Sequence, residues 1–451
     1  MAGDHHLHTH TLLLEAGSKT QVQLVCAILS AYRDGDHYAY EREECWHIGL
    51  GRGASLGLDP AGGFITLSAG EVSREQPVGR GFAEAARRFV AEHGKRGGKA
   101  FGFASFNYAL FSRGLRFEPG RWPLASLLVP RVEVTIQQER VVVTGGEQAD
   151  VEKIQALVEA AAPAEHGTRD SQSLDSSEGR DKYENSVGKA LAAIEQGRIS
   201  KVIVSRDIPI PGRVDMIATL LRGRAASTPR RTFSFSHAGF QATGFSPELV
   251  LSCDRGKVTT EPLAGTRAFT NSEAENQRLR RELENDPKEI REHIMSVKGA
   301  MEELGSICSP ETVVVEDLMS VRERGRVQHL GSSVAGSLSR DKDAWDALDV
   351  VFPSITASGL PKDEALLVVA EIERRPRELY SGAVLFLDDD ADVLEATLVL
   401  RTVFQDGQGQ WVQAGAGIIS QSVPRREFDE TCEKLGSIAP HVVQLGAGGS
   451  A

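Results

Sequence analysis

No run of about 20 consecutive apolar residues occurs in the 451 residues of this chain. A helix that crosses a membrane needs such a run, so we expect no membrane-spanning segment. The first ten residues are polar and rich in histidine. They lack the basic stretch followed by an apolar stretch that is typical of a secretory signal. We therefore expect a cytoplasmic protein that does not bind membranes.

Cysteine is also scarce, because the chain has only five. They are an odd number, widely separated and without a CxxC pair: Cys26, Cys45, Cys253, Cys308 and Cys432. Disulfide frameworks and structural zinc sites need paired or closely spaced cysteines. The pattern indicates free thiols in a reducing compartment.

An excess of positive charge is missing as well, since 51 Lys and Arg stand against 63 Asp and Glu, a formal charge of -12. This balance argues against a general affinity for nucleic acid or for an anionic membrane surface. An anionic substrate would need a local positive site within an unfavourable overall field. The hydrophobic content of 41% and charged content of 25% are ordinary for a globular protein with a large core.

The first part of the chain, residues 1–162, shows short apolar-polar alternations separated by glycine turns, such as KAFGFASFNYAL at 99–110. This alternation predicts a β-rich region, and we expect two helices within it, at Phe82–His93 and Ala149–Ala162. The following residues, 163–181, are polar and have no periodic apolar face. They predict a linker or a long loop.

From residue 182 to 445 helix and strand signals follow one another, beginning with a helical apolar face that ends at Gly197 and a strand at Lys201–Ile210. Strands come in runs instead of alternating with helices, so we expect an α+β protein with antiparallel sheets. Two apolar segments, Thr397–Val403 and Trp411–Ile419, flank the turn DGQGQ and predict a hairpin.

Two helix starts share an acidic pattern. In DPKEIREH at 286–293, proline opens the helix, and Glu289 and Glu292 lie three residues apart on one face. In PRREFDET at 424–431, proline again opens the helix, and Glu427 and Glu430 repeat the spacing. Acidic residues are favoured in the first turn of any helix, so simple capping is the alternative interpretation.

If the two acidic faces meet, four carboxylates repel one another unless a cation neutralises them. An all-oxygen site with few protein ligands suits Mg²⁺, which keeps several waters and uses one or two carboxylates together with an anionic substrate. A di-iron site would need Glu-x-x-His on two helices. Neither helix supplies this motif, so we discard it.

Several other residues are candidates for acid, base and anion-binding roles. A lysine with a lowered pKa and a glutamate with a raised pKa could form a base and acid pair near neutral pH, and Lys201 and Glu248 are the candidates. Arg401 lies in a predicted strand opposite Gly415, where glycine would leave room for a ligand beside a guanidinium group. A solvated lysine, a turn glutamate and a β-bulge beside a surface arginine are the respective alternatives. A tight turn at Gly265-Thr266-Arg267 and a core histidine at His329 are equally compatible with their local sequence.

Taken together, these segments resemble the chorismate-utilising enzymes, the family of anthranilate synthase component I, isochorismate synthase, aminodeoxychorismate synthase component I and salicylate synthase. The resemblance runs through nearly all of 182–440. It rests on SKVIVSR (200–206), GFSPELV (244–250), TEPLAGTRA (260–268), DPKEIREH (286–293), VRERGRVQHLGS (321–332), PSITASGLPK (353–362), LYSGAV (379–384), AGAGI (414–418) and REFDETCEK (426–434).

The resemblance implies an anthranilate synthase component I-like α+β fold, with two large, mostly antiparallel sheets and helices packed outside. It implies that Mg²⁺ is bound by Glu292 and Glu430, with Glu289 and Glu427 holding the waters of the metal. Lys201 would activate water, and Glu248 would protonate the departing hydroxyl. The remaining site residues would bind the substrate carboxylates (Tyr380, Arg401, Gly415 and Lys434) or line the pocket (Gly265, Thr266, His329 and Thr356).

Details of the motifs distinguish members of the family. Lys201 resembles the water-activating base of isochorismate-forming enzymes, which anthranilate synthases lack. Aminodeoxychorismate synthases carry a lysine where this chain has Ala264. The TASG motif at 356–359 resembles salicylate synthases. The resemblance therefore implies conversion of chorismate to salicylate and pyruvate through isochorismate, typically for siderophore-type biosynthesis, by a monomer without a glutaminase subunit. The alternatives are an isochorismate synthase that stops at the intermediate, an amide-transferring synthase that needs a glutaminase subunit, and a non-catalytic relative.

Overall fold

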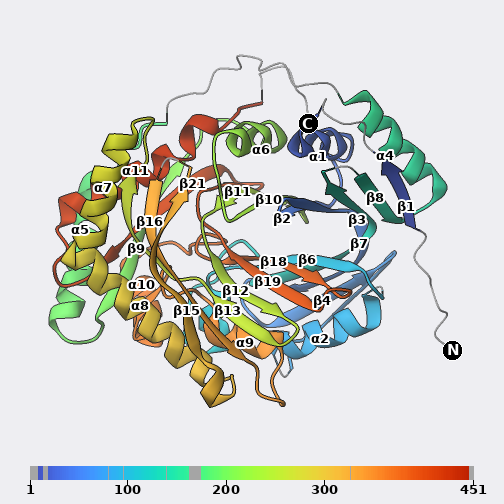
Figure 1. Cartoon of the computed structure of the whole chain (residues 1–451). Helices are drawn as coiled ribbons and strands as arrows, with labels where there is room; N and C mark the ends of the chain where they lie inside the picture. The colour runs from blue at the N-terminus through green and yellow to red at the C-terminus, as the bar shows by residue number, and fades with distance from the viewer. Residues whose placement is uncertain are drawn as a thin grey trace.

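The computed structural model describes residues 9–13, 19–79, 81–94, 96–138, 140–161, 174–325 and 327–445. Most of the predicted polar segment, residues 163–173, lies outside these ranges. Every strand pairing is antiparallel. The α+β prediction with two large antiparallel sheets and outer helices is confirmed (Figure 1).

Two long strands belong to both sheets: β3 (Cys45–Leu58) and β7 (Ala125–Gln137). Their pairing is interrupted by a register shift between Arg52 and Ala54. The first half of β3 pairs with β2 in one sheet, and its second half pairs with β4 in the other. A bulge bends a strand and increases its twist, so this interruption separates the two sheets while the backbone remains continuous.

The first sheet runs through strands in the order β1 (Thr9–Leu13), β8 (Arg140–Gly145), β7, β3, β2 (His37–Arg42), β10 (Arg231–His237), β11 (Phe240–Ser246), β20 (Thr402–Gln405), β21 (Gln410–Ile418), β9 (Lys201–Pro209) and β17 (Gly359–Leu360). The second runs through β5 (Val72–Pro77), β4 (Phe64–Ala69), β3, β7, β6 (Lys99–Ala104), β18 (Ala383–Asp388), β19 (Val393–Leu398), β12 (Leu249–Asp254), β13 (Lys257–Thr260) and β16 (Val327–Ser337), with β14 (Leu263–Ala268) and β15 (Val314–Arg324) also paired to β16.

The inner faces of the sheets enclose a core rich in aromatic side chains. Tyr38 and Tyr40 on β2, Phe233 and Phe235 on β10, and Phe386 on β18 are all buried there. Their spacing of two residues places alternate side chains on the same face of a strand. Several of these rings lie within stacking distance, for example Tyr38 and Phe235, whose centroids are 4.9 Å apart.

Helices cover the outer faces (Figure 1). On the first sheet, α1 (Gln21–Ala31), α4 (Gln148–Ala160) and α6 (Met216–Ala225) contribute buried apolar side chains to one core. On the second, α2 (Phe82–His93) and α9 (Ala344–Val351) contribute to another core. Helix α10 (Lys362–Ile372) adds buried side chains to the same core but packs on β9 and β17 of the first sheet. The other helices are α3 (Tyr108–Ser112), α5 (Arg180–Glu195), α7 (Glu273–Asn285), α8 (Pro287–Gly305) and α11 (Pro424–Gly436), with short 3-10 turns at Pro310–Thr312 and Ala439–His441.

The predicted hairpin is only partly correct. Strands β20 and β21 form it across residues 406–409, with Val403 opposite Val412. Arg401 lies before β20 with a φ of 51°, and Gly415 pairs with Ser205 of β9. The prediction that Arg401 lies in a strand opposite Gly415 is therefore wrong, because a left-handed residue interrupts the chain between β19 and β20. No helix in the described ranges is both long and apolar enough to span a membrane.

Candidate active site

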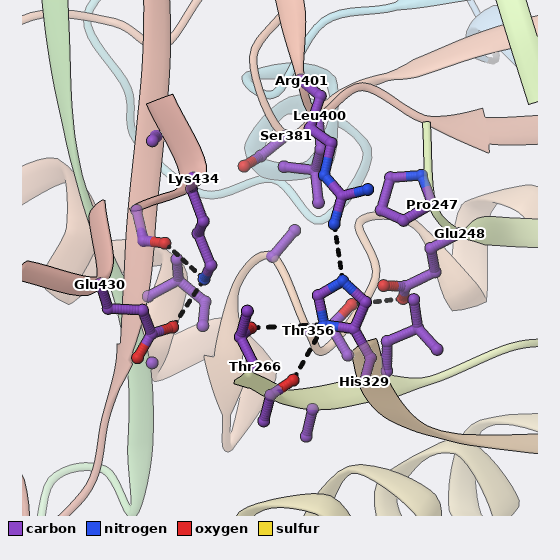
Figure 2. A pocket seen from close by; sticks show the side chains of 18 of the residues that line it. Pro247, Glu248, Thr266, His329, Thr356, Ser381, Leu400, Arg401, Glu430 and Lys434 are labelled. Atoms are coloured by element: carbon purple, nitrogen blue, oxygen red, sulfur yellow. Dashed lines mark hydrogen bonds and ion pairs between the residues drawn. The ribbon is translucent and has the colours of Figure 1, made fainter. Parts of the chain in front are cut away.

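A cavity lies where the ends of β9 and β21 approach β14, β16 and the first turns of α8 and α11, and its empty volume is about 820 Å³. Figure 2 shows side chains from β14, β16 and α11, and from the segments that precede β12, β18 and β20, around it. Among the predicted site residues, those that line the cavity are Glu248, Gly265, Thr266, Glu292, His329, Thr356, Tyr380, Arg401, Gly415, Glu430 and Lys434. Lys201, Glu289 and Glu427 are outside this lining and lie next to it.

The acidic turn of α8 is positioned by its cap. The Asp286 carboxylate accepts hydrogen bonds from the backbone amides of Lys288 and Glu289, at 2.9 and 3.4 Å, and Pro287 occupies the first helical position. Both devices stabilise a helix start. As predicted from their spacing, Glu289 and Glu292 then project from one face, and both residues are buried.

Each of the four glutamates has a cationic partner. Lys201 Nζ lies 3.0 Å from Glu292, and Lys434 Nζ lies 2.7 Å from Glu430. The partner of Glu427 is Lys288, at 2.9 Å, and that of Glu289 is Arg267, at 3.5 Å. Burying a carboxylate is unfavourable unless the charge is paired, so these contacts allow four acidic groups to gather beside one cavity.

The carboxylates also change one another's pKa values. Burial raises the pKa of Glu289 to about 7, with further upward contributions from Glu292 and Glu430. Burial likewise raises the pKa of Glu427, with Glu430 adding to it. Burial acts to raise the pKa of Glu430 too, but Lys434 and other nearby cations outweigh it and lower the pKa. The two acidic helix faces therefore share one electrostatic environment.

The donor set fits a hard divalent cation. All candidate donors are carboxylate oxygens, and Glu427 Oε2 is buried without a hydrogen-bond partner among the described residues. A side chain at Gly417 would collide with the Glu292 carboxylate, so the glycine leaves space for that group. No three His, Cys, Asp or Glu side chains converge as a ready cage within the described ranges. Mg²⁺ does not require such a cage, because it uses one or two carboxylates plus waters and a substrate.

Lys201 is the first residue of β9 and is fully buried. Besides Glu292, its Nζ donates to Ser296 Oγ on α8 at 3.0 Å. A lysine at the end of a strand is normally solvated, so a fully buried one held by two partners is unusual. The structure therefore holds this amine in a fixed position beside Glu292, which lines the cavity.

Glu248 follows Pro247 on another side of the cavity and is 2% exposed. Its carboxyl group accepts hydrogen bonds from Ser354 Oγ at 2.9 Å and from the Thr356 hydroxyl. Burial raises the pKa of Glu248 to about 8, although the two hydroxyl groups and Lys201 act in the opposite direction. The group is therefore a protonated carboxylic acid near neutral pH, and a pKa close to neutral pH suits it to act as a proton donor.

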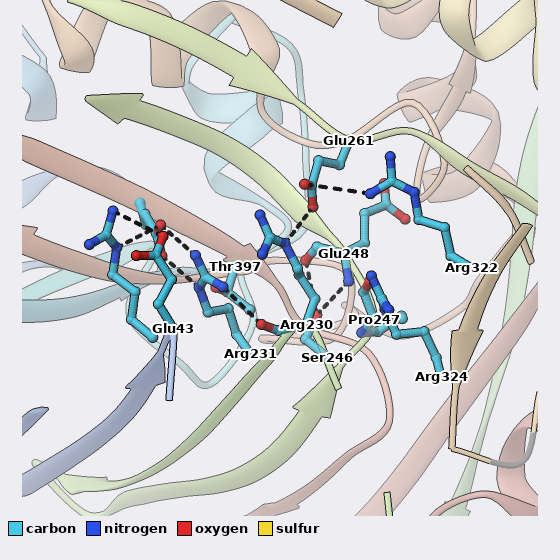
Figure 3. Close-up of polar contacts among 12 residues, drawn as sticks. Glu43, Arg230, Arg231, Ser246, Pro247, Glu248, Glu261, Arg322, Arg324 and Thr397 are labelled. Carbon is cyan, nitrogen blue, oxygen red and sulfur yellow. Dashed lines mark hydrogen bonds and ion pairs between the residues drawn. The ribbon is translucent and has the colours of Figure 1, made fainter. Parts of the chain in front are cut away.

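An arginine cluster supports the turn that carries Glu248 (Figure 3). Glu261 lies between Arg230, at 2.9 Å, and Arg322, at 3.7 Å. Arg324 Nε donates to the carbonyl oxygen of Pro247 at 3.4 Å. This cluster fixes the backbone immediately before the buried carboxyl group.

Arg401 and His329 form a hydrogen-bonded pair in the cavity wall (Figure 2). His329 Nδ1 donates to the Gly265 carbonyl oxygen at 2.9 Å, so its Nε2 accepts from Arg401 Nη2 at 2.6 Å. Burial, with Arg401 next, lowers the pKa of His329 well below its ordinary value and keeps the ring neutral. Burial and Arg324 lower the pKa of Arg401 to about 10. Among the described residues no carboxylate lies within 4 Å of Arg401, so the cavity holds a cation that lacks an acidic partner.

The remaining predicted residues also lie around the cavity. The Thr266 hydroxyl is 3.3 Å from His329 Nδ1, and the Gly415 carbonyl oxygen accepts from Lys434 Nζ at 2.8 Å. Tyr380 is 3% exposed, and its ring belongs to the aromatic core. Gly265 has a φ of 67°, and a side chain there would contact Glu289.

Some residues at the cavity were not singled out as site candidates from the sequence. The cavity is also lined by Ser381, Leu400, Gln413 and Gly417, and Lys288 and Ser296 hold Glu427 and Lys201. The position of Lys288 between Pro287 and Glu289 placed it in the acidic turn, but its partner is 139 residues away. For Ser381 no spacing or composition rule would have indicated a site.

Comparisons with known proteins agree with this geometry. The family described as chorismate binding enzyme matches residues 35–440. The salicylate synthase of Mycolicibacterium paratuberculosis is 37% identical over 424 residues, which cover 92% of each chain. Two solved structures share the fold. Anthranilate synthase component I from Streptococcus pneumoniae has a TM-score of 0.73 and 24% identity, covering 88% of this chain and 92% of that one. The menaquinone-specific isochorismate synthase from Escherichia coli has a TM-score of 0.71 and 19% identity, covering 97% and 94%.

Proposed function

The chain belongs to the family of chorismate binding enzymes, and on that premise we propose that it converts chorismate into salicylate and pyruvate by way of isochorismate, with Mg²⁺. The observation that supports this most directly is that Glu248, which is protonated near neutral pH, and Arg401, which has no carboxylate within 4 Å among the described residues, line one cavity. Lys201 lies next to that cavity, in contact with Glu292. The similarity to a salicylate synthase across 92% of both chains supports the choice of product.

The first reaction is an exchange of hydroxyl groups across the ring. Lys201, once it has given up the proton it holds in its ion pair with Glu292, accepts a proton from the water that attacks C2 of chorismate. The double bonds shift, and the C4 hydroxyl leaves as water with the proton that Glu248 donates. A base and an acid that act in one step contribute by supplying and removing protons in the transition state. The contacts of Lys201 with Glu292 and Ser296 hold its amine in place for this transfer.

Glu292 and Glu430 would hold the metal, and Glu289 and Glu427 would bind its waters. When bound, Mg²⁺ supplies Lewis-acid polarisation of the ring carboxylate. The four glutamates already have cationic partners. Arg401, which has no carboxylate within 4 Å in the described ranges, would neutralise one carboxylate of the substrate, and the metal would neutralise the other, which favours binding of metal and substrate together.

The second reaction is the loss of pyruvate from isochorismate through a pericyclic hydrogen transfer. It needs little acid or base and depends on a restrained side-chain conformation. Tyr380, Arg401 and Lys434 would supply that restraint by holding carboxylates, and His329 positions the Arg401 guanidinium group. Because the demand on the protein is mainly conformational, an enzyme that stops at isochorismate is the second candidate function.

The experiment combines purified protein, chorismate and MgCl₂ near neutral pH, followed by chromatography with fluorescence detection and a pyruvate assay. We expect salicylate and pyruvate in equal amounts. Isochorismate without pyruvate would favour the second candidate. An amino product in the presence of ammonium would contradict both, and no consumption of chorismate would overturn the enzymatic function itself.

The location, oligomeric state and metabolic role of the enzyme are also proposed from its membership of the family. We propose a cytoplasmic monomer that acts without a glutaminase subunit and supplies salicylate for a siderophore-type aryl cap. The position of Lys201 next to the cavity, where it would activate water instead of admitting ammonia, supports the proposal that no glutaminase is needed.

A further inference from the structure

Ser381 lies in the cavity wall and is fully buried. Its hydroxyl group has no hydrogen-bond partner among the described residues. It is close enough to the Tyr380 phenol to affect the pKa of that group, but no hydrogen bond of acceptable geometry joins them. A buried hydroxyl without a partner is unfavourable in the free protein, so its partner is expected to come from the occupant of the cavity.

The backbone of Ser381 is strained as well. Its φ is 61°, in the left-handed region that residues with a side chain avoid. Arg401 has a φ of 51°, and Figure 2 shows the two residues beside Leu400. The Ser381 amide donates to the Val399 carbonyl oxygen at 3.0 Å, which ties the two segments together. Strained non-glycine residues concentrate where a ligand is held, and here two of them share one wall.

The neighbourhood defines the chemistry of the missing partner. Arg401 offers a positive charge without a carboxylate within 4 Å in the described part of the chain, and Ser381 and Tyr380 offer hydroxyl groups next to it. One guanidinium and one hydroxyl donor match the two oxygens of a carboxylate. The glutamates that would hold the metal belong to α8 and α11, whereas Ser381 precedes β18 and Arg401 precedes β20.

We propose that Ser381 is a substrate-binding residue whose hydroxyl donates a hydrogen bond to the enolpyruvyl carboxylate of chorismate, beside Arg401. This assignment rests on the proposed function and goes beyond it by naming the residue that selects for the second carboxylate. The ring carboxylate, on the side of Glu292 and Glu430, does not contact Ser381.

The test is Ser381→Ala, which removes the hydroxyl and keeps a side chain at the left-handed position. We expect an unchanged or higher Tm, because the free protein loses only an unpaired polar group. We expect the KM for chorismate to rise about tenfold or more, as for a hydrogen bond to a charged group, with kcat within about twofold. A competitive cyclohexadiene inhibitor that carries the ring carboxylate but no enolpyruvyl group should keep its inhibition constant.

Ser234→Ala is the matched control. Ser234 is equally buried, but its Oγ is bonded to Thr243 Oγ1 at 2.8 Å on the β10–β11 pair. It should lower the Tm and leave the KM unchanged. An unchanged KM in Ser381→Ala would overturn the proposal, and so would equal weakening of chorismate and the inhibitor.

Following chorismate consumption separates this proposal from the proposed function. If the wild-type protein makes isochorismate but no salicylate, the product assignment fails, and the KM comparison still decides the role of Ser381. If the wild-type protein consumes no chorismate, both proposals are wrong.

Discussion

Replacing Arg401 by methionine should separate binding from stability. Burial and Arg324 lower the pKa of Arg401 to about 10, against an ordinary value of about 12.5. One pKa unit corresponds to about 1.4 kcal/mol, so at neutral pH the charged form destabilises the fold by up to about 3 kcal/mol. The side chain is partly open to the cavity, which reduces this penalty. Losing the bond to His329 destabilises by about 1–3 kcal/mol, so the two effects nearly cancel.

The effect on activity should be large. A guanidinium and a carboxylate about 4 Å apart attract by about 4 kcal/mol at an effective dielectric constant of about 20. We therefore expect kcat/KM of Arg401→Met to fall about 10³-fold, with the free energy of unfolding within about 2 kcal/mol of wild type. The assays are chorismate consumption and urea unfolding.

Arg231→Met provides the opposite case. Arg231 is 2% exposed and forms a bidentate pair with Glu395, at 2.7 and 2.8 Å, away from the cavity. Breaking a buried pair destabilises by about 3–5 kcal/mol, so this variant should unfold more easily and keep its KM below its unfolding transition. The reasoning on Arg401 is refuted if Arg401→Met loses as much stability as Arg231→Met, or if its kcat/KM falls less than tenfold.

Four further outcomes follow from the same geometry. Since burial raises the pKa of Glu248 to about 8, kcat should fall as the pH rises through 8. Glu248→Gln should lose this pH-dependent decrease, and its kcat should be at least about 100-fold lower. A pH-rate profile measures both, and an unchanged decrease in the variant would exclude Glu248 as the acid. The folded protein binds this proton between about pH 4.5 and 8 and the unfolded chain does not, so the free energy of unfolding should decrease over that range, and Glu248→Gln should remove that decrease in urea titrations. Lys201→Ala should lower kcat at least about 100-fold, whereas Ser296→Ala, which keeps the amine and its contact with Glu292, should retain most of it; equal losses would indicate a structural role for both. Removing Mg²⁺ with EDTA should abolish turnover, and MgCl₂ should restore it; full activity in EDTA would contradict the metal site.

Much of the local structure could be predicted from the sequence. The apolar periodicity at Phe82–His93 gave the observed bounds of α2, and proline at the first helical position located α8 and α11. These signals are local, because a cap, a proline or an apolar face acts within one or two turns.

The long-range arrangement was not predictable in this way. Strand β6 pairs with β18, so that Ala104 lies opposite Ala383, and neither segment carries a local signal for the other. The same limit explains the error at Arg401. Apolar neighbours indicated a strand, but a left-handed φ in a residue other than glycine depends on the surrounding packing.

The candidate site likewise contains features that local sequence patterns predict and features that depend on the tertiary structure. The Glu-x-x-Glu spacing indicated two acidic faces, and the resemblance to the family named most of the residues that line the cavity. The cationic partners of the glutamates and the unpaired hydroxyl of Ser381 become visible only when α8, α11, β9 and β18 are brought together.

The most direct test of the central claim is the origin of the oxygen atom in the product. Because water attacks C2 while the C4 hydroxyl leaves, turnover of chorismate in H₂¹⁸O with MgCl₂ should give salicylate with one ¹⁸O, in its hydroxyl group. Salicylate incubated in the same water without the protein controls for exchange. Salicylate with an unlabelled hydroxyl group would contradict the account, because the oxygen would then come from the substrate and Lys201 would have no water to activate.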